Sequence, residues 1–395
     1  MGDLKNLDQG LRSWQHDALK AWESSKYRGI IEVVTGGGKT RFALAAAKRW
    51  LDLNPKNSAV TIIVPTTALQ DQWYVNLIND LGVDKNDICI WPEQKLPSVQ
   101  FHVMVVNTAR QKMSWITEAH ANTLVIADEC HRYASEENSL ALKTPTQASL
   151  GLTATADREF DDGLERILVP NLGSIIYRYS LAQAKTDGVV VDFALTNIRV
   201  EFTEEEQTKY DRATKSLGIA LSQGDDVRAK QIAMRRASIS KNAISRITST
   251  IHLAETLKGK KIIIFHEDIA MADLIGSLLA ERHFRVVVFH SKIGKDMRRD
   301  NLRMFRSGQA DILVCCRALD EGIDVPEAEC AILAASTSSH RQRVQRLGRV
   351  LRTHTGKELA LIYTLYTSDS EELKLSHETN LLEGVASTRW LKMSN

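Results

Sequence analysis

Two regions of the chain alternate short apolar runs with amphipathic stretches, and this order predicts two parallel sheets. In the first region the apolar runs cover residues 29–32, 59–64, 88–91, 102–106, 123–127 and 149–152. A second region begins at Lys261, with runs at residues 262–265, 285–289, 311–315 and 331–333. Strands that alternate with helical segments are typical of parallel sheets with helices on both faces. We therefore expect an α/β protein with two such domains in tandem.

The segment between these regions carries helical signals instead. Thr203 precedes three glutamates, as in a capping box, and helical sequence continues to about Leu257 with a break at Gly224. Basic residues in this segment could contact a phosphate backbone, but a solvated helix face is the favoured interpretation. They are Arg228, Lys230, Arg235, Arg236, Lys241 and Arg246.

These patterns predict four parts of the chain. Residues 1–170 form the first sheet domain, 171–258 a largely helical connector, 259–366 the second sheet domain and 367–395 a C-terminal tail. The tail, which contains Trp390, either packs on the second domain or docks a partner, and the sequence does not decide between them.

Composition narrows the class of protein. The chain has 395 residues and a formal net charge of +2, so any nucleic-acid contact needs a local grouping of basic residues. Its five cysteines contain no Cys-x-x-Cys pair, which argues against a disulfide framework or a structural zinc site. The first residues are polar and no apolar run reaches membrane-spanning length. We expect an intracellular protein, cytoplasmic or nucleoid-associated, without membrane contact.

A glycine-rich stretch between the first strand and its helix predicts a phosphate-binding loop. It reads Gly36-Gly37-Gly38-Lys39-Thr40. The glycines let several N–H groups face one anion, Lys39 reaches the β- and γ-phosphates, and the Thr40 hydroxyl can ligate Mg²⁺. Val33 stands where a strict pattern has glycine, so an ordinary glycine-rich turn is the alternative.

Two further groups of residues fit the same nucleotide. Asp128, after a buried strand, can hold Mg²⁺ while Glu129 takes a proton from the attacking water. Gln15, in a helix capped by Ser13, can offer a donor and an acceptor to an adenine edge, with Arg12 just before it. The alternatives are a solvated acidic pair and an ordinary amphipathic helix.

The second domain has no Gly-Lys-Thr loop but carries a candidate arginine-finger helix. Arg349 and Arg352 are three residues apart, so they share a helix face, and planar guanidinium groups suit a γ-phosphate. The alternative is an exposed basic helix. Gly322 permits close approach of backbone. Cys315 and Cys316 lie in a predicted strand and are most simply core residues.

Taken in order, these motifs resemble a known family. The first half carries Gln15, the loop at 36–40, Pro65-Thr66, Asp128-Glu129-Cys130-His131 and Thr153-Ala154-Thr155. This order resembles a superfamily 2 helicase with a DExH-type box, and the resemblance covers residues 10–365. It is strongest to the branch of xeroderma pigmentosum group B type DNA helicases and restriction-enzyme motor subunits. Thr67 stands where many RNA helicases have arginine, and Thr153 replaces the usual serine.

The resemblance implies roles for single residues in two RecA-like domains that bind ATP and Mg²⁺. Gln345 would order the attacking water, with Arg349 and Arg352 as fingers facing the phosphate loop, and Asp324 would lie near the ribose or the interdomain cleft. The residues implied in gripping nucleic acid are Thr66, Thr108, His290 and Arg317. Thr153 and Thr155 would link the ATP pocket to that groove. His131 either joins the two domains by a hydrogen bond or is a plain structural histidine.

The implied function is an ATP-dependent helicase or translocase, with DNA favoured over RNA by the branch. It would unwind or remodel branched DNA in repair, recombination or replication. The alternative is a nucleic-acid sensor or clamp in which ATP regulates grip. Another form of that alternative is the motor subunit of a larger restriction or defence complex, with a protein partner.

Overall fold

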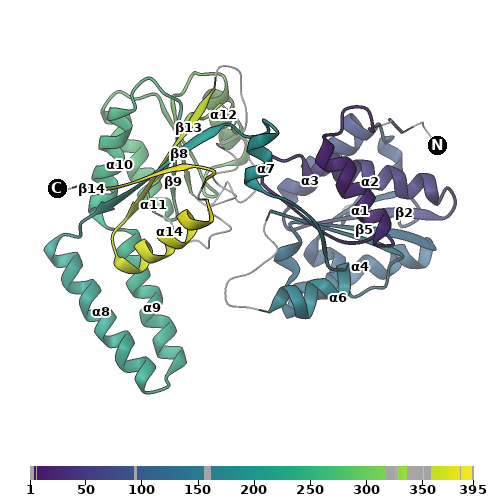
Figure 1. Ribbon diagram of the computed structural model, residues 1–395, viewed down its shortest axis with the longest axis horizontal. Helices are drawn as coiled ribbons and strands as arrows, with labels where there is room; N and C mark the ends of the chain where they lie inside the picture. The colour runs from purple at the N-terminus through teal and green to yellow at the C-terminus, as the bar shows by residue number, and fades with distance from the viewer. Residues whose placement is uncertain are drawn as a thin grey trace. The chain divides into compact units, whose positions relative to one another are not determined.

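The computed structural model describes residues 4–5, 7–92, 96–154, 162–316, 325, 327–335, 350, 357–382 and 384–393. The chain forms two compact units, residues 1–184 and residues 185–395. Each unit contains one seven-stranded sheet (Figure 1). The predicted α/β class with two sheet domains in tandem is therefore confirmed.

All neighbouring strands of the first sheet pair in parallel. In sheet order they are β3 (Ile88–Ile90), β4 (Phe101–Val105), β2 (Ser58–Val64), β5 (Asn122–Asp128), β6 (Ala148–Thr153), β1 (Arg28–Val33) and β7 (Ile175–Tyr179). The six predicted strands of this domain are all present within one or two residues of the predicted ends, because each is an apolar run buried in the core.

The helices of the first unit follow its strands in the expected order. They are α1 (Ser13–Ser24), α2 (Lys39–Leu53), α3 (Thr67–Asn76), α4 (Val106–Ala119), α5 (Glu136–Ser139), α6 (Val169–Leu172) and α7 (Leu181–Thr186), the last crossing the unit boundary. Helix α4 buries Ala109, Met113 and Ile116 against strand residues such as Ile63 and Met104. Burial of a large apolar side chain such as Met113 or Ile116 stabilises by about 1.5–3 kcal/mol.

The second sheet is also parallel throughout. In sheet order its strands are β10 (Val286–Phe289), β11 (Ile312–Cys316), β9 (Ile262–His266), β12 (Cys330–Leu333), β13 (Leu359–Tyr366), β8 (Asp192–Val200) and β14 (Ser387–Met393). Cys315 and Cys316 are buried, as predicted for core residues.

Six helices of the second unit lie in the described part of the chain. They are α8 (Glu204–Ser222), α9 (Asp226–Lys241), α10 (Ile244–Thr256), α11 (Ile269–Glu281), α12 (Lys295–Arg306) and α14 (Asp369–Leu381). Thr203 forms the predicted capping box with Glu206, and Gly224 takes a left-handed φ of +70° between α8 and α9. These two helices extend side by side away from the sheet (Figure 1).

The predicted domain boundaries differ from the structure in two places. Strand β7 adds to the first sheet beyond residue 170, and β8 belongs to the second sheet, so residues 171–258 are not a separate connector. The predicted tail supplies α14 and β14, which pairs with β8. Trp390 therefore packs on the second domain, with its ring 5.8 Å from that of Tyr366. Over the described residues, no helix is both long enough and apolar enough to cross a membrane.

Candidate active site

The predicted phosphate-binding loop joins the end of β1 to the start of α2. Gly36 and Gly38 have φ values of +87° and +102°, a region that side chains rarely adopt. A Cβ on Gly37 would come within 2.5 Å of Val33 Cγ1 and 3.0 Å of the Val34 carbonyl oxygen. The glycines therefore allow a tight turn directly before the N-terminus of α2, where a helix attracts anions.

Side chains from the start of α1 hold this loop. Arg12 Nη1 donates to the Gly37 carbonyl at 2.8 Å, and the Gln15 amide nitrogen donates to the Gly38 carbonyl at 2.9 Å. Gln15 Oε1 accepts the Arg12 N–H at 2.7 Å, and Gln15 is only 1% exposed. The structure thus places both residues beside the nucleotide site through contacts with the loop, while their contact with adenine stays a prediction.

Lys39 lies between the loop and the acidic pair. Its ammonium group donates to the Val33 carbonyl at 3.3 Å and is 3.9 Å from Glu129 Oε1. Thr40 follows it in the first turn of α2. Residues that are far apart in the chain are therefore brought to one edge of the first sheet, where parallel strands end and ligands bind.

Asp128 is the last residue of β5 and is buried. Trp73 Nε1 donates to its Oδ2 at 2.8 Å, and the Glu129 N–H donates to its Oδ1 at 3.0 Å. Burial, and then the nearby charge of Glu129, raises the pKa of Asp128 to about 6. A carboxylate held this way suits an Mg²⁺ ligand, since a divalent cation offsets the cost of burying the charge.

Glu129 turns the chain directly after β5. Its φ of +49° lies in the left-handed region, which is uncommon for a residue with a side chain. This backbone conformation gives the Glu129 side chain a different direction from that of Asp128. Its Oε2 lies 3.5 Å from His131 Nδ1, and that nitrogen is 2.9 Å from Thr153 Oγ1. The buried His131 thus connects the acidic motif to the end of β6 within the first unit, and a hydrogen bond from it to the second domain stays a prediction.

Two predicted nucleic-acid residues lie at the same edge of the first sheet. Thr66 caps α3 after β2, and its Oγ1 accepts the Leu69 N–H at 3.4 Å. Thr108 lies in the first turn of α4 after β4. Both side chains are partly exposed, so each could reach a strand lying across this edge.

His290 departs from its predicted role. It is 3% exposed, and its Nε2 lies 2.8 Å from Asp273 Oδ1 on α11. A histidine buried behind the end of β10 cannot grip a phosphate backbone directly. Ser291 and Lys292, which follow it, are exposed.

The remaining predicted site residues lie outside the described residues. They are Arg317, Gly322, Asp324, Gln345, Arg349 and Arg352, together with Thr155. Their roles stay predictions.

The sequence interpretation missed several polar contacts made by aromatic residues. Trp14 Nε1 donates to the Gly37 carbonyl at 3.2 Å, and Trp73 holds Asp128 as described. The Tyr133 hydroxyl donates to the carbonyls of Ile63 and Asp128, both at 2.9 Å. Buried indole and phenol groups usually find a hydrogen-bond partner. Aromatic residues close to the motifs were therefore the signal in the sequence from which these contacts could have been predicted.

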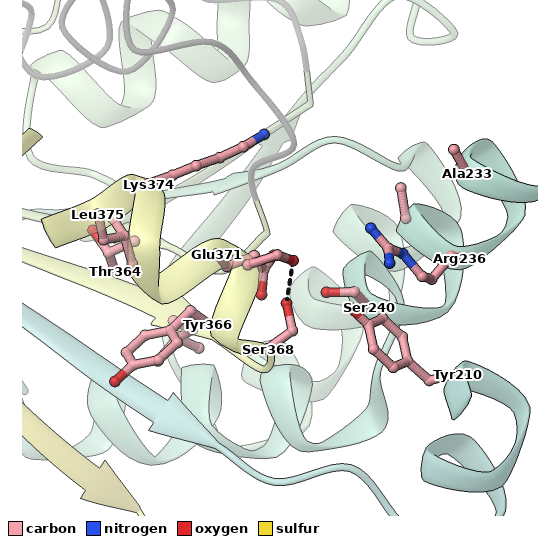
Figure 2. Close-up of a pocket in the computed structure, with 13 residues that line it drawn as sticks. Tyr210, Ala233, Arg236, Ser240, Thr364, Tyr366, Ser368, Glu371, Lys374 and Leu375 are labelled. Atoms are coloured by element: carbon pink, nitrogen blue, oxygen red, sulfur yellow. Dashed lines mark hydrogen bonds between the residues drawn. The ribbon is translucent and has the colours of Figure 1, made fainter. Parts of the chain in front are cut away.

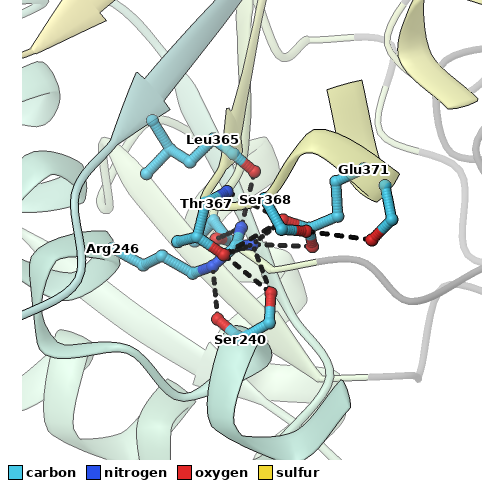
Figure 3. A network of polar contacts seen from close by, with 8 residues as sticks. Ser240, Arg246, Leu365, Thr367, Ser368 and Glu371 are labelled. Carbon is cyan, nitrogen blue, oxygen red and sulfur yellow. Dashed lines mark hydrogen bonds and ion pairs between the residues drawn. The ribbon is translucent and has the colours of Figure 1, made fainter. Parts of the chain in front are cut away.

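Arg246 was also misassigned, because it is neither on a solvated face nor available to a phosphate. It is 1% exposed at the start of α10 and donates to the carbonyls of Ala334 and Leu365 at 3.0 and 2.5 Å (Figure 3). Its Nη2 lies 2.7 Å from both carboxylate oxygens of Glu371. Although burial opposes ionisation, Arg246 and the Thr367 N–H leave the pKa of Glu371 below its usual value.

Two family models match the chain. Residues 8–158 match the type III restriction enzyme, res subunit, and residues 243–354 match the helicase conserved C-terminal domain. The two matches cover the two sheet units separately.

Relatives and a solved structure match over most of the chain. The DNA 3'-5' translocase XPB2 of Sulfurisphaera tokodaii is 31% identical over an alignment of 388 positions, which covers 93% of this chain and 83% of that protein. The DNA 3'-5' helicase XPB of Kineococcus radiotolerans is 23% identical over 94% of this chain and 62% of its own length. S. cerevisiae Dbp5 bound to RNA and ADP BeF3 has a TM-score of 0.66 at 14% identity, over 98% of this chain and 90% of that one, and shows a shared fold.

Proposed function

The chain belongs to the superfamily 2 helicases, in the branch that holds the XPB helicases, and is an ATP-hydrolysing helicase or translocase. From that premise, we propose that it moves along DNA by closing and opening one composite ATP site. The observation that carries the proposal is the position of Lys39, between the phosphate loop and Glu129. The names of the relatives favour DNA as the substrate.

In the first unit, the loop amides and Lys39 bind the phosphates, and Glu129 accepts a proton from the attacking water. Asp128 and the Thr40 hydroxyl would hold Mg²⁺, which neutralises charge on the phosphates when bound. The buried Asp128 carboxylate fits this role, because Trp73 and the Glu129 N–H fix its oxygens at the end of β5.

The second unit completes the site in this proposal. Gln345 orders the attacking water, and Arg349 and Arg352 contact the γ-phosphate, with Asp324 and Gly322 near the ribose. Arginine fingers of this kind are worth about 10³ to 10⁵ in rate. Loss of the γ-phosphate removes a contact that only the closed state makes, so the units separate after hydrolysis.

A DNA strand would be held alternately by the two units. Thr66 and Thr108 would bind phosphates on the first unit, and Arg317 on the second. Ser291 and Lys292 replace His290 in this role, because His290 is buried and they are exposed. Hydroxyl and backbone contacts hold phosphates without reading sequence, which suits a chain of net charge +2.

The link between hydrolysis and grip would pass through His131. Its Nδ1 lies close to both Glu129 Oε2 and Thr153 Oγ1, so a movement of the water-activating carboxylate changes the contact with the end of β6. Thr155 would continue this path towards the strand.

The first test is the ATPase rate of the intact chain with and without single- and double-stranded DNA and RNA. We expect stimulation by DNA, and Lys39→Ala should reduce turnover to background because the phosphates lose their main cation. Lys48→Ala is the matched control, since Lys48 lies on the same helix and pairs with Asp52, one turn further along it, at 2.7 Å. The motor proposal fails if no nucleic acid changes the rate.

A second variant tests the composite site. Arg349→Ala should lower turnover at least 10³-fold while ATP still binds, because a finger acts on the transition state. Turnover equal to that of the unmodified chain would refute the finger assignment.

A motor subunit without strand separation of its own is the second candidate, favoured by the match of residues 8–158 to a restriction-enzyme subunit. Displacement of one strand from a forked duplex separates the two. Release of the strand supports a helicase, whereas ATP hydrolysis without release supports a translocating subunit.

A further inference from the structure

A cavity lies in the second unit, and none of the described residues that line it was assigned to the ATP site or to the grip on nucleic acid. It encloses about 170 Å³ between the bases of α8 and α9, the end of β13 and the first turns of α14 (Figure 2). Tyr210 and Arg236 line it from the helix pair, and Glu371 and Lys374 from α14. The proposed motor cycle gives this space no role.

The acidic group at this cavity is already neutralised. Both carboxylate oxygens of Glu371 lie 2.7 Å from the buried Arg246 Nη2, and the Thr367 N–H donates to Oε2 at 2.8 Å. Ser240, which also lines the cavity, accepts from Arg246 through its carbonyl at 2.8 Å (Figure 3). The Arg246–Glu371 pair therefore adds no net charge to the wall.

Two further cations line the cavity, so its net charge is positive. Arg236 comes from α9 and Lys374 from α14. Within the described part of the chain neither forms an ion pair, and the Arg236 guanidinium lies 5.6 Å from the centre of the Tyr210 ring. The hydroxyls of Ser368 and Ser370 are 3.1 Å apart at the same wall and supply neutral donors.

Apolar and aromatic side chains lie beside these cations. Ala233 and Ala237 are on α9 with Arg236, Leu375 follows Lys374 on α14, and the Tyr210 ring lies under the Arg236 guanidinium. A ligand that fits this lining has an anionic group next to a flat, weakly polar group.

We propose that this cavity binds a nucleotide, with its phosphate between Arg236 and Lys374 and its base against Tyr210 and the alanines. Charge-assisted hydrogen bonds from a guanidinium and an ammonium favour a phosphate over a neutral group. The same chemistry has two sources, a free mononucleotide and the phosphorylated end of a DNA strand.

The test is titration calorimetry on the intact chain carrying Lys39→Ala, which weakens phosphate binding at the loop. The probes are dAMP, a 5'-phosphorylated thymidine trinucleotide and the same trinucleotide without the phosphate. We expect the phosphate to improve the affinity of the trinucleotide at least tenfold, since charged hydrogen bonds are among the strongest in proteins. Binding of dAMP at similar affinity identifies a free nucleotide as the ligand, whereas binding of the phosphorylated trinucleotide alone identifies a strand end.

Matched variants locate the binding. Arg236→Gln and Lys374→Gln should each weaken the phosphorylated probe about tenfold. Arg235→Gln is the control, because Arg235 is exposed on the same helix and does not line the cavity. Equal affinity with and without the phosphate overturns the proposal, and so does an equal loss in the Arg235 and Arg236 variants.

Two controls accompany these measurements. Unfolding curves of each variant exclude a folding defect. The DNA-stimulated ATPase rate of Arg236→Gln with Lys39 intact tests the motor separately.

Discussion

At the scale of single residues, the phosphate loop depends on contacts that no motif pattern specifies. The glycines could be predicted from the sequence, because only they permit the φ values and close packing found at positions 36–38. The sequence predicted that Gln15 contacts the adenine, but the structure shows that its amide holds the loop. A glutamine amide has two donors, so the loop contact and a base contact can coexist.

Gln15→Ala separates these two roles. If Gln15 acts through the loop, the variant removes one of two hydrogen bonds to the partly buried Gly38 carbonyl, which still accepts the Phe42 N–H, and this loss costs about 0.5–1.5 kcal/mol. The KM for ATP and for GTP should then rise by a similar factor. A rise for ATP alone would show that base recognition is its main role. Asp17→Ala, at an exposed position of the same helix, should leave both KM values unchanged.

The misassignment of Arg246 shows what sequence cannot supply at this scale. Five basic residues near it lie in the same helical segment, and charge alone does not reveal which of them turns inward. Burial of Arg246 depends on acceptors from β13 and α14, more than 100 residues further along the chain. Only the assembled sheet brings them together.

At the scale of elements, the pair between Arg246 and Glu371 fixes α10 and α14 to the ends of β12 and β13. Arg246→Met should lower the free energy of unfolding of the second unit by about 3–5 kcal/mol, because Glu371 loses its partner while remaining largely buried. The double variant Arg246→Met with Glu371→Gln should recover part of this loss, since no unpaired charge remains. Urea unfolding at neutral pH measures both.

The pH dependence of the same variants is the control. The pKa of Glu371 is lower in the folded chain, so its contribution is present above the usual carboxyl pKa of 4.5 and is lost as the pH falls through the folded value. The difference in unfolding free energy between the unmodified chain and the double variant should therefore shrink on acidification. A difference that grows in acid would contradict the ion-pair assignment.

Two of the elements missed from the sequence, β7 and β14, lie at sheet edges and lack a buried apolar run. Strand β14 exposes 39% of Trp390 and 53% of Leu391, so its pattern resembles a surface segment. Strand β7, at the edge of the first sheet, mixes isoleucine with tyrosine and arginine and is only partly buried. Strands β8 and β13 lie inside the second sheet and were also missed, although both bury several apolar side chains, so the edge position does not explain them. Edge pairing uses backbone groups, which carry no residue signature, whereas central strands need apolar side chains on both faces.

At the scale of the whole molecule, the unit boundary at residue 184 predicts which N-terminal fragments are stable on their own. A fragment of residues 1–184 should unfold cooperatively, whereas residues 1–170 should be less stable or aggregate. The shorter fragment lacks β7 and leaves the backbone groups of β1 exposed at the sheet edge. Thermal unfolding followed by circular dichroism compares them. Equal melting temperatures would show that β7 contributes nothing to the first unit.

The short passage from β7 to β8 has a mechanical consequence. The chain leaves the first sheet at Tyr179 and enters the second at Asp192, and both strands are bonded along their length to neighbours. Residues 180–191 are therefore anchored at both ends by paired strands. Movement of one unit relative to the other can straighten this passage, but it can lengthen it no further without breaking hydrogen bonds of β7 or β8 to their neighbours.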